Sequence, residues 1–229
     1  VQDWGLGKVD LLPSLRAPLS SLPFLSVNAS LGYRVTYFTE SLDPATRRQV
    51  EESVTRRYAD MRAEFVGPIL TRVFNPNNAF ADRAKHIREP AFTVQRITSI
   101  DNQNQIPTTA SYEYIGGGVT RITYGLTNRL LVRRGGGGAE GTAAGGAGGA
   151  TTSGAPRQVL SVGINQSYYS DETASPYDNS YSYSLYQRPP SNYSAVSLMA
   201  RAMPAQAVGL DFRMEYDPIA IQRRLVGFG

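Results

Sequence analysis

The strongest constraint on the fold of this chain is a strict alternation of apolar and polar residues between Leu25 and Tyr37. The seven odd-numbered positions of this segment are all apolar, and none of the six even-numbered positions is. Successive side chains of a β-strand point to opposite faces, so a period of two predicts a strand with one apolar side. The segment is therefore expected to form a long strand in a sheet with two chemically different faces.

The same alternation recurs along most of the chain and predicts an all-β protein, an antiparallel meander of about nine long strands. It is clear in residues 120–134 and 207–217, whereas residues 86–98 carry polar and apolar side chains on both sides. Residues 51–64 have charges at helical spacing, but we expect a strand there because the alternation continues beyond Gly67-Pro68. The predicted strands cover residues 8–20, 24–38, 53–74, 86–98, 120–134, 158–170, 192–203, 207–217 and 219–228.

The lengths of the strands and of their connections favour a membrane barrel. Most predicted strands exceed the roughly 5–6 residues usual in soluble proteins and match the roughly 9–11 residues that cross a membrane at a tilt. The connections at 20–23 and at Pro204 are short, whereas those at 39–52, 99–119 and 171–191 are long. Short turns at one end and long loops at the other are typical of outer-membrane barrels.

One connection has an unusual composition. Residues 135–154 read GGGGAEGTAAGGAGGATTSG. A segment so rich in glycine and so poor in apolar residues cannot bury a core, which predicts a flexible insert. It lacks the Gly-Lys-Ser/Thr ending of a phosphate-binding loop, and no helix is expected after it. We therefore interpret residues 1–229 as one partial outer-membrane β-barrel domain with a flexible insert at 135–154.

Composition argues against catalysis. The chain has no cysteine and one histidine, which excludes disulfides, a cysteine nucleophile and a Cys/His zinc site. His86 lies beside Lys85 and is interpreted as a polar residue at a strand end. Asp211 and Glu215 share a strand face with Arg213 between them, which indicates an ion ladder rather than a pair of acid–base catalysts. We expect no enzyme activity, no cofactor and no metal site.

The surroundings of the charged strand faces distinguish a soluble β-sandwich from a membrane barrel. In a soluble β-sandwich they would be outer faces in contact with solvent, and in a large barrel they would line a water-filled lumen. Strand length, the pattern of connections and aromatic residues near strand ends, such as Tyr37-Phe38 and Tyr168-Tyr169, favour the barrel. Nine strands with so many charges pointing inward would form an arc of a larger barrel. The candidate lumen-facing residues are Arg34, Arg62, Arg121, Arg129, Arg213, Asp211 and Glu215.

Several segments resemble, in the same order, the barrel of one protein family, the LPS-assembly proteins called LptD or organic solvent tolerance protein. The resemblance lies in the order and spacing of these segments, which span nearly the whole chain. They are residues 9–15 (VDLLPSL), 17–19 (APL), 32–37 (GYRVTY), 88–90 (REP), 106–107 (IP), 120–130 (TRITYGLTNRL) and 166–169 (QSYY).

This resemblance implies a location in the cell outer membrane and a function in inserting lipopolysaccharide into the outer leaflet. It implies lipopolysaccharide and outer-membrane lipids as partners, together with an LptE-like lipoprotein plug and a periplasmic bridge that delivers the lipid. The lipid would leave between the first and last strands of the barrel. The chain resembles an interior part of that barrel, without the family's periplasmic domain or paired cysteines, and its glycine-rich insert replaces a short turn.

Other interpretations remain open. The arginines on the charged faces would pair with phosphates and acidic sugars, or would balance the carboxylates across the lumen. The chain would belong to another outer-membrane pore, such as a porin or a secretion barrel, or would be a soluble glycan-binding β-sandwich. Nucleic acid is not expected as a partner, because the 21 arginines are spread over many strands. The start at Val1-Gln2, with neither a methionine nor a signal sequence, predicts a piece of a longer protein.

Overall fold

A computed structural model describes residues 5–20, 22–76, 81–107, 116–133, 156–172, 190–205, 208–219 and 222–229. Strands dominate these ranges, in which no α-helix occurs and the one helical turn is the 3-10 turn η1 (Gln103–Gln105). None of the helical structure described is long and apolar enough to cross a lipid bilayer. The strands are β1 (Lys8–Leu11), β2 (Ser14–Pro18), β3 (Ser26–Phe38), β4 (Ser41–Leu42), β5 (Gln49–Val50), β6 (Val54–Val66), β7 (Leu70–Phe74), β8 (Arg83–Ile97), β9 (Thr120–Arg133), β10 (Arg157–Tyr169), β11 (Val196–Ala205), β12 (Val208–Asp217) and β13 (Gln222–Phe228).

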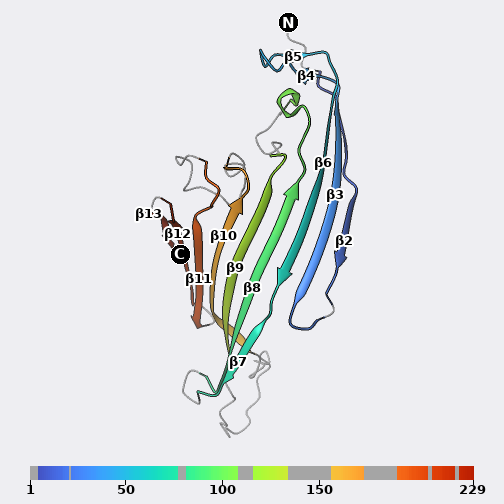
Figure 1. The fold of residues 1–229 in the computed structure, drawn as a ribbon. Helices are drawn as coiled ribbons and strands as arrows, with labels where there is room; N and C mark the ends of the chain where they lie inside the picture. The colour runs from blue at the N-terminus through green and yellow to red at the C-terminus, as the bar shows by residue number, and fades with distance from the viewer. Residues whose placement is uncertain are drawn as a thin grey trace, which may run out of the picture.

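Eleven of these strands form one curved sheet (Figure 1). Its order is β1-β3-β6-β8-β9-β10-β11-β12-β13, with β2 also beside β3 and β7 also beside β8, and every pair is antiparallel. The predicted all-β antiparallel meander is therefore confirmed. The remaining two strands, β4 and β5, form a small hairpin at one end of the sheet.

Two predicted strands are each interrupted. Residues 8–20 form β1 and β2, separated by Leu12-Pro13, where the proline ring removes a backbone donor. The register with β3 is unbroken, because Leu11 pairs with Val35 and Ser14 with Gly32. Residues 53–74 form β6 and β7, which pair with successive parts of β8 on either side of Gly67.

Gly67 causes the second interruption. Its φ angle is 120°, in a region that side chains with a Cβ rarely adopt. Its N–H donates to the carbonyl of Pro90 at 2.8 Å, while the N–H of Ile69 leaves the ladder and donates to Phe24 at 3.0 Å. The chain therefore keeps β8 as its neighbour but has one extra residue relative to it, since Val66 pairs with Ala91 and Leu70 with Arg88. The alternation of side chains could not reveal this shift.

The strands are strongly staggered. Ala29 is the fourth residue of β3, and the paired residues reached by crossing the sheet from it are Ala63, Val94, Ile122 and Tyr168. Tyr168 is the twelfth residue of β10, which runs in the same direction as β3. The strands thus shift by eight residues over four steps across the sheet, and such a shift accompanies strand tilt in curved sheets.

The largest apolar cluster lies at one end of the sheet, where connections cover it. Phe38, Val54 and Tyr58 pack there against Ile100 and Ile106 of the connection after β8. The β4–β5 hairpin is tied to the same connection by Arg47, whose Nη1 donates to the carbonyl of Asn104 at 2.8 Å. Tyr37 and Phe38 were both expected to act as aromatic residues of a barrel near a strand end, but only Tyr37 is exposed, because neighbouring strand residues face opposite sides. Tyr168 and the buried Tyr169 differ in the same way.

Candidate functional site on the charged face of the sheet

All seven candidate residues lie on one face of the sheet, named here the charged face. The pairing Arg62–Gln95–Arg121 joins β6, β8 and β9 on this face. The pairing Arg129–Ser161–Arg201–Asp211 extends it from β9 to β12. Arg34 on β3 pairs with Tyr58, which lies four residues before Arg62 on β6. On β12, Arg213 and Glu215 follow Asp211 by two and four residues. Side chains separated by an even number of residues on a strand point to the same side, so these three residues share the face.

The first group of polar side chains on this face joins β1, β3 and β6. Arg34 donates from Nε and Nη2 to the carboxylate of Asp10 at 2.9 and 2.5 Å. The hydroxyl of Thr36 donates to the same carboxylate at 2.8 Å, and Arg34 Nη1 reaches the hydroxyl of Tyr58 at 3.4 Å. Asp10 thus receives a bidentate charge-assisted contact, which fixes the arginine against the sheet.

A buried arginine lies next to this group. Arg56 is 4% exposed, and its guanidinium lies 5.6 Å from the ring centre of Phe38 and 6.0 Å from that of Tyr58. Its Nη2 donates to the hydroxyl of Thr36 at 3.3 Å. The aromatic faces compensate part of the cost of burying the charge. This end of the charged face is therefore closely packed.

The second group joins β6, β8, β9 and β10. The amide nitrogen of Gln95 donates to both carboxylate oxygens of Asp60 at 2.9 Å, and its amide oxygen accepts from Arg121 Nη2 at 2.7 Å. Beside it, the hydroxyls of Thr123 and Ser167 are hydrogen-bonded at 2.9 Å. Sequence reasoning did not single out Gln95, because the strand that carries it has a mixed pattern. Only its cross-strand neighbours reveal its role as a link between opposite charges.

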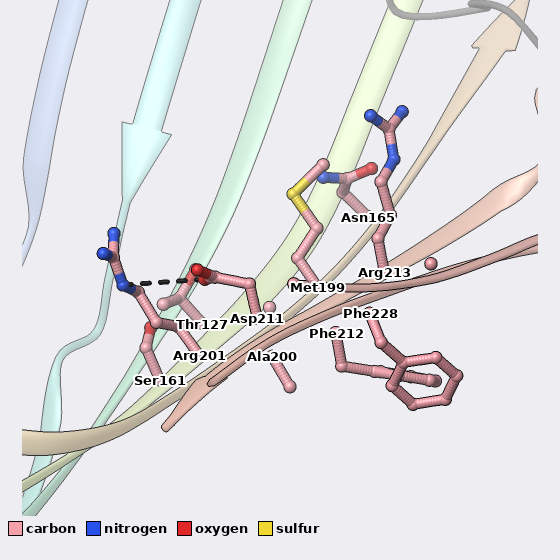
Figure 2. Close-up of a pocket in the computed structure, with 13 residues that line it drawn as sticks. Thr127, Ser161, Asn165, Met199, Ala200, Arg201, Asp211, Phe212, Arg213 and Phe228 are labelled. Carbon is pink, nitrogen blue, oxygen red and sulfur yellow. Dashed lines mark ion pairs between the residues drawn. The ribbon is translucent and has the colours of Figure 1, made fainter. Parts of the chain in front are cut away.

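The third group lies on β11 and β12 and borders a groove of about 640 Å³. Arg201 and Asp211 face each other across the two strands at 3.5 Å, and Arg213 donates to Glu215 on the same strand at 2.6 Å. Figure 2 shows Met199, Asn165 and Arg213 on one side of the strands and the rings of Phe212 and Phe228 on the other. The predicted ion ladder of β12 is therefore present, although Asp211 pairs across strands rather than with Arg213.

Two further ion pairs of the described residues lie on the charged face. Arg129 contacts Glu89 at 2.9 Å, and Arg62 contacts Glu64 at 3.5 Å with both side chains more than 40% exposed. Carboxylates thus lie close to most of the candidate arginines. The face is a mosaic of both charges, which suits contact with water and with ligands that carry several polar groups.

The two ion pairs of β12 should differ in their contribution to stability. Glu215 is 5% exposed, whereas both members of the Arg201–Asp211 pair are more than half exposed. Arg213→Gln leaves a buried carboxylate with weaker compensation and should lower the free energy of unfolding by about 1–3 kcal/mol. Arg201→Gln removes a solvent-screened contact and should cost less than about 1 kcal/mol. Urea titration of the full-length protein in lipid vesicles measures both, and equal losses would contradict the prediction.

His86 and the acidic residues are the other side chains for which the sequence raised a chemical role. His86 is the fourth residue of β8 rather than its end, and it pairs with Leu130 and Arg72. Among the described residues, no group of three or more acidic or histidine side chains could hold a metal ion. Asp43 forms the β4–β5 turn, where hydrogen bonds from the backbone and hydroxyl of Thr46 hold the pKa of its carboxyl below the ordinary value. The insert at 135–154 lies outside the described residues.

Comparison with known proteins does not identify this chain: no protein-family model and no curated protein matches it.

Proposed function

We propose that this chain forms part of the wall of a large transmembrane β-barrel in the outer membrane, and that this barrel inserts lipopolysaccharide into the outer leaflet. The observation that carries the proposal is a single-layered sheet with one charged face and one exposed apolar face. The family resemblance supplies the class of substrate. Each of these points supports a different part of the proposal.

The apolar face supports a membrane environment. Within the described ranges, no second sheet covers it. Large apolar side chains remain exposed across its width, and contiguous patches of this kind are rare on soluble monomers. Lipid acyl chains would cover such a face without a second protein layer. The exposed apolar side chains on this face are Leu15, Leu31, Tyr33, Met61, Phe92, Tyr124, Leu160, Ile164, Leu210, Val226 and Phe228.

The charged face supports a water-filled interior and a polar, anionic substrate. Arg34 and Arg121 lie in the two segments, 32–37 and 120–130, that carry much of the resemblance to the LptD family. Guanidinium groups bind phosphate bidentately, and lipopolysaccharide carries phosphates and acidic sugars. The proposed partners are therefore lipopolysaccharide and outer-membrane lipids, with a lipoprotein plug of the LptE type and a periplasmic bridge. Catalysis, cofactors and nucleic acid have no part in this proposal.

Depletion of the full-length protein in its native host tests the transport function. We expect lipopolysaccharide to disappear from the cell surface and sensitivity to vancomycin to rise, because the outer leaflet would lose its tightly packed lipid. Surface labelling of lipopolysaccharide and growth with vancomycin measure these effects, and re-expression of the wild-type protein is the control. Normal surface lipopolysaccharide after depletion would contradict the proposal and favour a porin or a secretion barrel.

A solubility measurement tests the membrane location separately. We expect the full-length protein to fractionate with outer membranes and to need detergent after extraction, because its apolar face has no protein cover. A protein that stays folded and monomeric in buffer without detergent would instead support a soluble glycan-binding protein.

A further inference from the structure

We propose that Arg16, Ser30 and Arg62 form a seat for the phosphate group of a larger ligand on the charged face. The three residues belong to β2, β3 and β6, three neighbouring strands at one side of the sheet (Figure 1). Arg16 pairs with Ser30, and Ser30 pairs with Arg62, so the serine lies directly between the two arginines. None of the three belongs to the first two hydrogen-bonded groups described above.

The spacing of this row fits a tetrahedral anion. Adjacent strands lie about 4.8 Å apart, so the Cα atoms of Arg16 and Arg62 are separated by roughly 10 Å. Two extended arginine side chains can bind a phosphate group from opposite sides across that span, each with two parallel N–H donors. The short side chain of Ser30 leaves the space between them open and offers a hydroxyl donor from below.

The charge balance of the row favours an anion. Among the residues that the structure describes, none forms an ion pair with Arg16. In the described part of the chain, the one carboxylate paired with Arg62 is that of Glu64, at 3.5 Å and with both side chains well exposed, which is a weak pair. Near the groove of β12, by comparison, Arg201 and Arg213 are both in ion pairs with a carboxylate. The row on β2, β3 and β6 has two arginines and one paired carboxylate, Glu64, and so keeps one positive charge.

The cavity around this row is larger than a phosphate ion. It measures about 470 Å³ and is lined by Arg16, Ser30, Arg62, Asn28 and Glu64, together with Ala17, Pro18 and Ala29. The polar groups of Asn28 and Glu64 would contact hydroxyls next to the phosphate, as in a phosphorylated sugar. The ligand class is therefore a sugar phosphate, either free or as the headgroup of a glycolipid. Only the link to lipopolysaccharide rests on the proposed function.

Calorimetric titration of the purified full-length protein in non-ionic detergent tests the seat. The probes are inorganic phosphate, glucosamine 1-phosphate, and micelles of a phosphorylated disaccharide glycolipid or of its dephosphorylated form. We expect Arg16→Gln and Arg62→Gln each to weaken binding of the phosphorylated probes about tenfold, because each removes a charge-assisted contact. Ser30→Ala should weaken it by less. Tighter binding of the glycolipid than of glucosamine 1-phosphate would assign the seat to a headgroup, and the reverse order to a free sugar phosphate.

Arg57→Gln is the matched control. Arg57 is an exposed arginine of the same strand, β6, but it lies five residues from Arg62 and so faces the opposite side. It should bind the phosphorylated probes like the wild type. Equal weakening by Arg57→Gln, no weakening by Arg16→Gln or Arg62→Gln in a folded protein, or equal binding of the phosphorylated and dephosphorylated glycolipids would overturn the seat. Heat-dependent mobility on SDS gels shows that each variant is folded.

The two proposals can fail independently. If depletion leaves surface lipopolysaccharide normal while Arg16→Gln still weakens phosphate binding, the transport function is wrong and the seat stands. If depletion abolishes surface lipopolysaccharide while both arginine variants bind the phosphorylated probes like the wild type, the seat is wrong and transport stands.

Discussion

Arginine in place of Leu126 or Leu210 should lower the free energy of unfolding of the full-length protein in lipid vesicles by about 2–4 kcal/mol. Leu126 pairs with Pro90 and Ile164 on the apolar face, and Leu210 is 55% exposed on the same face. In the proposed orientation, each new guanidinium would be forced among acyl chains far from water. Urea titration measures the loss, and cell fractionation should show reduced assembly in the outer membrane.

Thr127→Arg is the control for this result. Thr127 follows Leu126 on β9 but lies on the charged face, opposite Glu89 and beside the groove of β12. The new arginine would meet a carboxylate and water, so we expect a change of about 0.5 kcal/mol or less. If Leu126→Arg and Leu210→Arg assemble as well as Thr127→Arg, the apolar face does not contact lipid.

Gly67→Ala should destabilise the protein by about 2–4 kcal/mol, the second large effect expected. A Cβ at this position would lie 2.3 Å from the carbonyl oxygen of Phe24 and 3.1 Å from the Cα of Leu25. Both atoms belong to the backbone, so no side-chain rotation relieves the overlap. The φ angle of 120° adds a second cost, since residues with a Cβ rarely adopt it. Urea titration of the variant measures both together.

Gly209→Ala is the matched glycine control. Gly209 lies within β12, and nothing lies within 4 Å of a Cβ built there. Alanine also loses less conformational freedom than glycine on folding, so this variant should be neutral or slightly stabilising. Similar losses for Gly67→Ala and Gly209→Ala would mean that the contact with Phe24 does not limit the packing around Gly67.

The sequence predicts the faces of this sheet better than its interruptions. Alternation depends only on side-chain direction, so it correctly assigned Arg34, Asp211 and Leu210 to their faces. The break at Gly67 depends on a backbone angle and on a contact with Phe24, and neither leaves a trace in the alternation. The β4–β5 hairpin was missed for a related reason, because strands of two residues are too short to show a period.

Contacts across the sheet were less predictable still. The sequence predicted that Arg121 lies on the charged face, but its link to Asp60 through the amide of Gln95 depends on the register of three strands. Phe38 is buried rather than exposed, because a connection more than sixty residues away in sequence folds onto it. Such contacts require the paired structure, whereas the arginines themselves can be identified from composition and pattern.

In the proposed membrane setting, the tilt that accompanies the stagger of the strands would account for their length. Strands such as β3, β6 and β10 have 13 residues, which corresponds to a length of roughly 43 Å at about 3.3 Å per residue. A strand of this length that ran parallel to the membrane normal would extend several residues beyond the hydrocarbon layer of a bilayer, which is about 30 Å thick. Inclined at about 45°, the same strand rises only roughly 30 Å. In the proposed setting, the tilt therefore lets a strand of 13 residues span the hydrocarbon layer without projecting beyond it. A shorter strand at the same tilt would leave backbone groups of its neighbours unpaired within the lipid.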